Sequence, residues 1–169
     1  MATAAPRLLD RPAQLYLGVR RFVTMETIGH IADAIPELLA ELERQGVRPD
    51  GAPFLRYLTI DMARELEVEA GVPIAAPVHP VDDHVVRALP AGRYVTVTHV
   101  GSPDGLVDAT AGLLRWADEE GLAWDVHDTP RGQAWGCRLE VYRTDPRVEP
   151  DVGNWETDLV FKLATVPES

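Results

Sequence analysis

The same order of predicted elements occurs twice along this 169-residue chain. Residues 15–25 alternate in character with a period of two, which predicts a strand. From 27 to 46, apolar residues recur at three- and four-residue steps, which predicts an amphipathic helix that a glycine ends. Pro36 fits best in a first helical turn, so a kink or a restart of the helix is expected there. Two strand-like segments follow, 54–60 and 65–73, with a short connection typical of a hairpin. The first half, 15–73, is therefore predicted to run strand, helix, strand, strand.

The second half, residues 85–164, repeats this order. Residues 85–100 contain two apolar stretches around a Pro-Ala-Gly turn, and Ser102 then caps a helix with a proline at its first position. Strand-like segments at 137–144 and 155–163 complete the half. The duplication predicts an α+β domain, in which two strand-helix-strand-strand units build antiparallel sheets around a pseudo-twofold axis. The space between the halves is a natural ligand cleft.

These boundaries predict one domain over residues 15–166, with a linker at 74–84 between the halves. A chain of this length can bury a proper core as a single domain. Residues 1–14 carry Ala, Pro and Arg without periodicity, so a flexible N-terminal segment is expected there.

Charge and composition restrict the partners. Sixteen basic against 27 acidic residues give a net charge of −11, which argues against nucleic-acid binding, as does the lack of a segment left over for a helix-turn-helix. No run reaches the ~18 apolar residues of a membrane span, and no signal peptide is evident, so a cytoplasmic protein without membrane contact is expected. Cys137 stands alone and the histidines lack metal-ligand spacing, so neither metal nor cofactor is expected. The oligomeric state stays open.

Three motifs stand out along the chain: Glu-Val-Glu-Ala-Gly-Val-Pro-Ile at 67–74, Leu-Pro-Ala-Gly-Arg-Tyr-Val-Thr-Val-Thr-His-Val-Gly at 89–101, and Leu-Glu-Val-Tyr-Arg-Thr-Asp-Pro at 139–146 followed by Trp-Glu-Thr-Asp-Leu-Val at 155–160. They resemble motifs of GyrI-like small-molecule-binding domains, the effector-binding domains of MerR- and AraC-type multidrug-sensing regulators. They occur in the family's order, and the resemblance covers residues 15–164. The family has Pro-Tyr where this chain has Ser102-Pro103, so the ligand preference stays open.

Glu140 is the leading candidate for the floor of the cleft. In a strand, side chains alternate, so Arg138, Glu140 and Tyr142 share one face and the residues between them take the other. By pattern alone, Glu140 is either a solvent-facing carboxylate paired with Arg138 or a functional group. The resemblance implies the second reading, since the family's matching glutamate lies in its cleft. A partly desolvated carboxylate there attracts a lipophilic cation.

Aromatic residues supply the second set of candidates, because their faces stack on flat ligands and stabilise cations. Tyr142 follows from strand geometry, since it shares the face of the carboxylate. Trp116 and Trp155 follow from the resemblance, and Tyr57 lies on the matching strand of the first half. Trp135 is a weaker candidate, as a lid residue in an irregular segment at 124–135. The alternative for each residue is ordinary core packing.

The resemblance implies a stand-alone protein that binds a small hydrophobic or cationic ligand, without the DNA-binding fusion of its relatives. One alternative is a hydrolase of cyclopropane-containing natural products, in which Glu140 would activate water and an aromatic residue would position the electrophile. No catalytic residue is otherwise assigned. The other alternative is a protein-binding module that inhibits gyrase, as the family name suggests.

Overall fold

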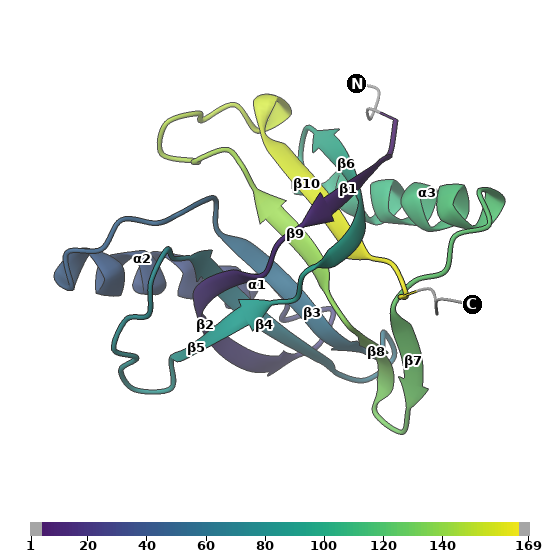
Figure 1. Ribbon diagram of the computed structural model, residues 1–169. Helices are drawn as coiled ribbons and strands as arrows, with labels where there is room; N and C mark the ends of the chain where they lie inside the picture. Colours follow the sequence, from purple (N-terminus) through teal and green to yellow (C-terminus); the bar gives the residue numbers. More distant parts are fainter. Residues whose placement is uncertain (1–4, 166–169) are drawn as a thin grey trace.

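One curled antiparallel sheet of ten strands runs through the computed structural model, which describes residues 5–165 (Figure 1). The first half of the chain supplies β1 (Arg7–Arg11), β2 (Gln14–Val23), α1 (Gly29–Ala32), α2 (Ala34–Arg44), β3 (Phe54–Ile60) and β4 (Leu66–Pro73). The second half supplies β5 (Val85–Leu89), β6 (Gly92–Val100), the 3₁₀ turn η1 (Pro103–Gly105), α3 (Leu106–Glu119), β7 (Val126–Thr129), β8 (Gly132–Trp135), β9 (Arg138–Tyr142), η2 (Val152–Asn154) and β10 (Glu156–Lys162).

The strand order confirms the duplicated plan. Along the sheet it runs β1-β6-β10-β9-β3-β4-β2-β5. The strands β6, β10 and β9 of the second half correspond to β2, β4 and β3 of the first half, and the two sets occur in mirrored order. The halves meet where β9 pairs with β3. That central pairing is antiparallel and places Leu55 opposite Glu140. The β7–β8 hairpin lies off this path and attaches through β8 to the end of β3. The predicted α+β class with paired halves is therefore correct.

Each half also sends a short arm to the other half. β1, which precedes β2, pairs with β6, and β5, which precedes β6, pairs with β2. Both arms turn into the next strand through the same dipeptide, Pro12-Ala13 and Pro90-Ala91. In both, the tyrosine four residues after the proline, Tyr16 or Tyr94, is buried against the same cluster. The arms are thus a further element of the duplication.

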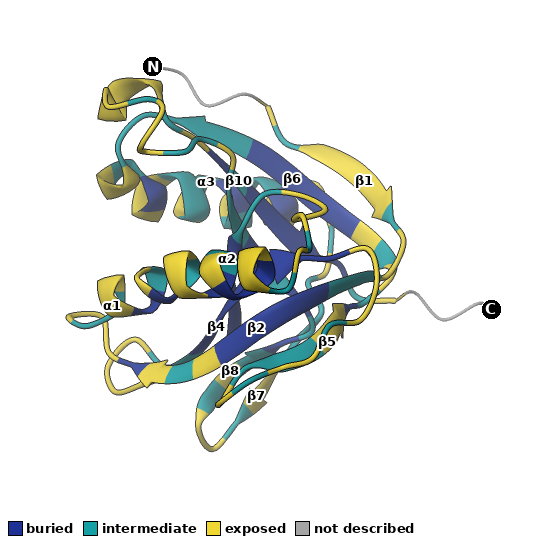
Figure 2. Ribbon diagram, turned by 90° about the vertical axis from the view of Figure 1, so that its left-hand side faces the viewer, coloured by how far each residue is buried: buried dark blue, intermediate teal, exposed yellow. Residues whose placement is uncertain are grey.

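Both helical regions pack on the same face of the sheet but over different strands. α2 covers β4 and β2, whereas α3 covers β6. The apolar stripe predicted for the first helical segment supplies the buried contacts, with Ile31, Leu38 and Leu42 fully enclosed. Figure 2 shows α3 and α2 one above the other on this side, each with an exposed outer surface. This arrangement separates the two helical regions over the central strands β3 and β9.

The other face of the sheet curls around a second, smaller core. Tyr16, Phe54, Tyr94 and Cys137 are packed there, and the rings of Tyr16 and Phe54 meet edge to face with centroids 5.1 Å apart. Alternation along β9 separates the two sides as the sequence predicted, since Leu139 belongs to this core while its neighbours face the helices.

Three sequence-based expectations need correction. Within the N-terminal segment expected to be flexible, β1 is an ordered strand, because β6 offers it an edge to pair with; residues 1–4 lie outside the described part. The helix over 27–46 restarts near Pro36 as expected, but the break lies at Asp33, between α1 and α2, so Pro36 is in the first turn of α2, where its missing N–H costs least.

The third correction concerns the segment 124–135, which is a β-hairpin and not an irregular stretch. Trp135 is buried there, with its ring 5.9 Å from that of Trp124 and 5.6 Å from that of Phe161. Trp135 is therefore a core residue and not a lid residue. Within residues 5–165, no helix is long and apolar enough to cross a membrane.

Candidate functional site

A cleft of about 1220 Å³ opens between the two helical regions, and the central strands β3 and β9 form its floor. Its position follows from the packing, since α2 and α3 sit on the outer strands of their own halves. Apolar side chains form both walls. One wall comes from α2 and the residues around α1, the other from η1 and α3: Ile28, Ile35 and Leu39, and Pro103, Leu106 and Val107.

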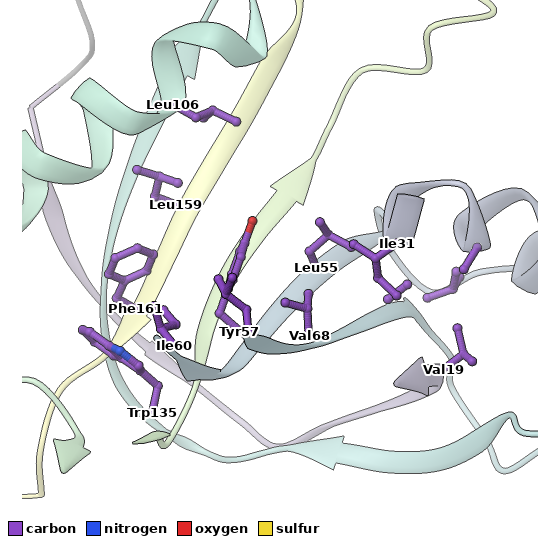
Figure 3. Close-up of a cluster of buried hydrophobic side chains, with 14 of the residues drawn as sticks. Val19, Ile31, Leu55, Tyr57, Ile60, Val68, Leu106, Trp135, Leu159 and Phe161 are labelled. Carbon is purple, nitrogen blue, oxygen red and sulfur yellow. The ribbon is translucent and has the colours of Figure 1, made fainter. Parts of the chain in front are cut away.

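Glu140 lies on this floor and is held by two tyrosines. The hydroxyl groups of Tyr57 and Tyr142 donate hydrogen bonds to the same carboxylate oxygen, Oε1, at 2.7 and 3.0 Å. Tyr57 comes from β3 and the other two residues from β9, so the cluster spans the junction of the halves. In Figure 3, the hydroxyl of Tyr57 points away from the core residues Ile60 and Val68 and toward the space between Leu106 and Leu55.

Burial sets the protonation state of these tyrosines. It raises the pKa of both Tyr57 and Tyr142 well above the ordinary value of 10.0, and the negative charge of Glu140 raises the pKa further. Both hydroxyls therefore stay neutral donors at any physiological pH. Two O–H donors directed at one oxygen orient the carboxylate while leaving its charge uncancelled.

Arg138 lies next to this cluster, two residues before Glu140 on the same face of β9. Its guanidinium carbon is 4.8 Å from the ring centre of Trp135, 4.7 Å from that of Phe161 and 5.9 Å from that of Tyr57. Burial lowers the pKa of Arg138, and Tyr57 and Glu140 act in the opposite direction. An arginine stays cationic under such a shift, so the floor carries one charge of each sign.

Two ion pairs lie in and beside the loop at the rim of the cleft. Arg147 contacts Asp145 at 3.0 Å within the loop between β9 and β10, and Arg143 lies 3.7 Å from Asp158. Exposed pairs of this kind contribute little to stability and cancel each other's field. Glu43, Arg48 and Glu156 also line the cleft and are exposed, so solvent and salt screen their charges. The charges that solvent screens least are those of the floor.

The structure brings four of the five predicted ligand-binding residues together. Glu140, Tyr142, Tyr57 and Trp155 all line the cleft, and the indole N–H of Trp155 is held by the carbonyl oxygen of Glu149 at 2.7 Å. Trp116 does not line the cleft; it is half-buried on α3 and packs against the main core. Its helical phase places it beside core positions and not toward the opening.

Sequence reasoning did not name Arg138 or the helical walls as site residues. The alternation along β9 places Arg138 on the same face as Glu140, so this pattern could have identified Arg138 as a site residue. The wall residues Ile28, Ile35 and Leu39 belong to the apolar stripe of a helix, and a stripe alone does not distinguish core from cleft. Among the residues that the structure describes, no three His, Cys, Asp or Glu side chains are grouped so that they could hold a metal ion.

The comparison with known families decides the classification. Residues 4–164 match the GyrI-like small molecule binding domain. The chain belongs to this family. As a GyrI-like domain it binds small molecules, and the cleft between its halves is the candidate site. A search of curated proteins found no match.

Solved structures share the GyrI-like fold. The EcmrR C-terminal domain superposes with a TM-score of 0.76 at 18% identity, with 98% of this chain and 100% of that chain covered. In an EcmrR–DNA complex, this chain covers only 58% of the EcmrR chain (TM-score 0.77, 19% identity, 96% of this chain covered). SAV2435, solved bound to tetraphenylphosphonium, superposes with a TM-score of 0.66 at 9% identity, with 95% and 94% covered. A hydrolase from Listeria innocua superposes with a TM-score of 0.59 at 17% identity, with 94% and 91% covered.

Proposed function

We propose that this GyrI-like domain binds lipophilic aromatic cations, and that the charge of Glu140 selects them. The observation that carries the proposal is the hydrogen bonding of this carboxylate. It accepts from the neutral hydroxyls of Tyr57 and Tyr142 and, within residues 5–165, forms no ion pair. Arg138 lies nearby without forming an ion pair with it, so a cationic ligand supplies a positive charge in direct contact with the carboxylate.

The surroundings of Glu140 strengthen that attraction. Apolar side chains form much of the lining, so a ligand that fills the cleft and displaces its water meets the floor charge in a medium less polarisable than bulk water. The aromatic faces of Tyr57, Tyr142 and Trp155 add cation–π contacts of about 0.5–2 kcal/mol each. Tetraphenylphosphonium, the molecule bound to SAV2435, has this chemistry: a single positive charge enclosed by aromatic rings.

The test is the substitution Glu140→Gln, with tetraphenylphosphonium binding measured by titration calorimetry. Glutamine keeps the volume and a carbonyl acceptor for the tyrosines but removes the charge. We expect the binding free energy to weaken by about 1–3 kcal/mol. Binding of triphenylphosphine oxide, which is neutral and of similar shape, should change much less.

Glu119→Gln is the matched control, because Glu119 lies at the exposed end of α3 and outside the cleft. It removes the same charge from the molecule and should leave the affinity for the cation unchanged. Equal affinities for tetraphenylphosphonium in the wild type and Glu140→Gln would show that Glu140 does not select cations.

A second candidate function is hydrolysis of a strained electrophile such as a cyclopropane-containing natural product. The observation in its favour is that both tyrosines bond to Oε1, so Oε2 of Glu140 has no hydrogen-bond donor among the described residues and could take a proton from water. The Listeria innocua structure with this fold carries the description hydrolase. Here Glu140→Gln should abolish product formation, measured by chromatography, while substrate binding survives.

A further inference from the structure

Arg138 is held in the cleft floor by aromatic rings alone. The rings of Trp135, Phe161 and Tyr57 lie next to its guanidinium. Such cation–π contacts provide no hydrogen-bond acceptor for the N–H donors of the guanidinium. Among residues 5–165 it donates no hydrogen bond and forms no ion pair, not even with Glu140.

The other enclosed arginine of the sheet shows what a purely structural role requires. Arg56, on the opposite face, donates from Nη1 to the hydroxyl of Tyr16 and from Nη2 to the carbonyl oxygen of Gly136, both at 3.0 Å. These two acceptors offset part of its cost of burial, although its Nε has no partner among the described residues. Arg138 has no such acceptors, and its side chain lines the open cleft, so acceptors can reach it only from the cleft.

The positions of Arg138 and Glu140 on the floor define which charged groups a ligand must carry to contact both. Arg138 and Glu140 are two residues apart on one face of β9, which places their Cα atoms about 6.6 Å apart. Tyr57 lies between them, with its hydroxyl on Glu140 and its ring beside Arg138. A ligand that covers both groups therefore needs a positive and a negative end within the span of one aromatic system.

We propose that Arg138 binds a carboxylate of the ligand, so that the cleft is built for aromatic zwitterions whose cationic end lies at Glu140. This inference rests on the proposed function and adds a second anchor to it. The planar guanidinium fork matches a carboxylate, which also carries the single negative charge needed to balance Arg138. A doubly charged anion would be repelled by Glu140 and by a chain whose net charge is −11.

Two dyes with one aromatic skeleton provide the test. Rhodamine B is a zwitterion at neutral pH, and its ethyl ester is a cation that lacks the carboxylate. Fluorescence anisotropy gives the Kd of each dye with the full chain. In Arg138→Met, which keeps an unbranched apolar stem, we expect the Kd of rhodamine B to rise about 10- to 100-fold. The Kd of the ester should not rise, because the substitution removes a positive charge that repels this cation. Arg138→Lys, which keeps the charge without the fork, should fall between wild type and Arg138→Met for rhodamine B.

The matched control is Arg115→Met, because Arg115 is exposed on α3 outside the cleft, and it should alter neither affinity. If Arg138→Met weakens both dyes equally, or neither, Arg138 is a packing residue and the inference is overturned. Should Arg138→Met fail to melt cooperatively, Arg138→Lys decides by the same criterion. Failure of the cation proposal is separate: Glu140→Gln would then leave ester binding unchanged. A wild type that binds neither dye overturns both.

Discussion

Two glutamates on opposite faces of the same sheet both accept hydrogen bonds from tyrosine, but their surroundings differ. Glu69 on β4 is fully buried and bonds to the hydroxyl of Tyr16. Its other oxygen lies 3.9 Å from Nε of Arg20 and 3.8 Å from Nε of Arg87. Glu140 accepts from two tyrosines, has no such cations in contact, and lines the cleft.

The difference separates a structural charge from one available to a ligand. Around Glu69 the protein itself provides the counter-charges, so removing any member leaves another uncompensated. Around Glu140 the protein provides orientation without neutralisation, and the open cleft is where a counter-charge can enter. Burial and tyrosine contacts are common to both clusters, so neither property alone identifies a binding residue.

Alkaline pH should have the largest effect and should act on both faces together. Burial raises the pKa of Tyr16 and Tyr94 on one face and of Tyr57 and Tyr142 on the other above the ordinary value of 10.0. Their folded-state pKa values exceed the unfolded value, so the stability they contribute is complete below pH 10 and is lost as the pH rises through the folded values. Circular dichroism and tyrosinate absorbance should change in one step. Tyrosinate formation near pH 10 with the fold intact would contradict this.

Glu69→Ala should have the next largest effect and should act on stability. It leaves the buried hydroxyl of Tyr16 without its acceptor and removes the carboxylate next to Arg87 and Arg20, although Arg20 keeps Glu67. We expect the free energy of unfolding to fall by about 3 kcal/mol. Glu140→Gln should cost less than about 1 kcal/mol, because an acceptor for both tyrosines remains. Urea titrations followed by fluorescence provide both values. Equal losses would remove the distinction between the two glutamates.

The smallest effects should mark the boundary of the cleft. Trp155→Leu removes an aromatic face from the cleft lining and should weaken tetraphenylphosphonium binding by about 1 kcal/mol. Trp116→Phe, outside the lining, should change the same binding free energy by less than about 0.3 kcal/mol. Calorimetry on both variants measures the contrast, and a larger loss in Trp116→Phe would place the ligand on the side of α3 that carries Trp116, outside the cleft.

Much of the cleft floor follows from local sequence, because strand alternation acts over neighbouring residues. It placed Glu140 and Tyr142 on one face, and matching the halves added Tyr57 from β3. The features that were missed depend on distant partners. β1 looked irregular because its pairing with β6 involves residues more than 80 positions away. Trp116 was assigned by family position, and only its rotation on α3 excludes it from the lining.

The exchanged arms have a consequence for how this molecule loses its structure. Since β1 completes the second half and β5 completes the first, neither half can detach without unpairing an edge strand of the other. The halves therefore act as one cooperative unit, and their unfolding should be all-or-none. If the chain is cut between β4 and β5, the two fragments should stay assembled, because each provides an edge strand to the sheet of the other. The assembly would resemble a domain-swapped dimer in which the subunits exchange their first strands.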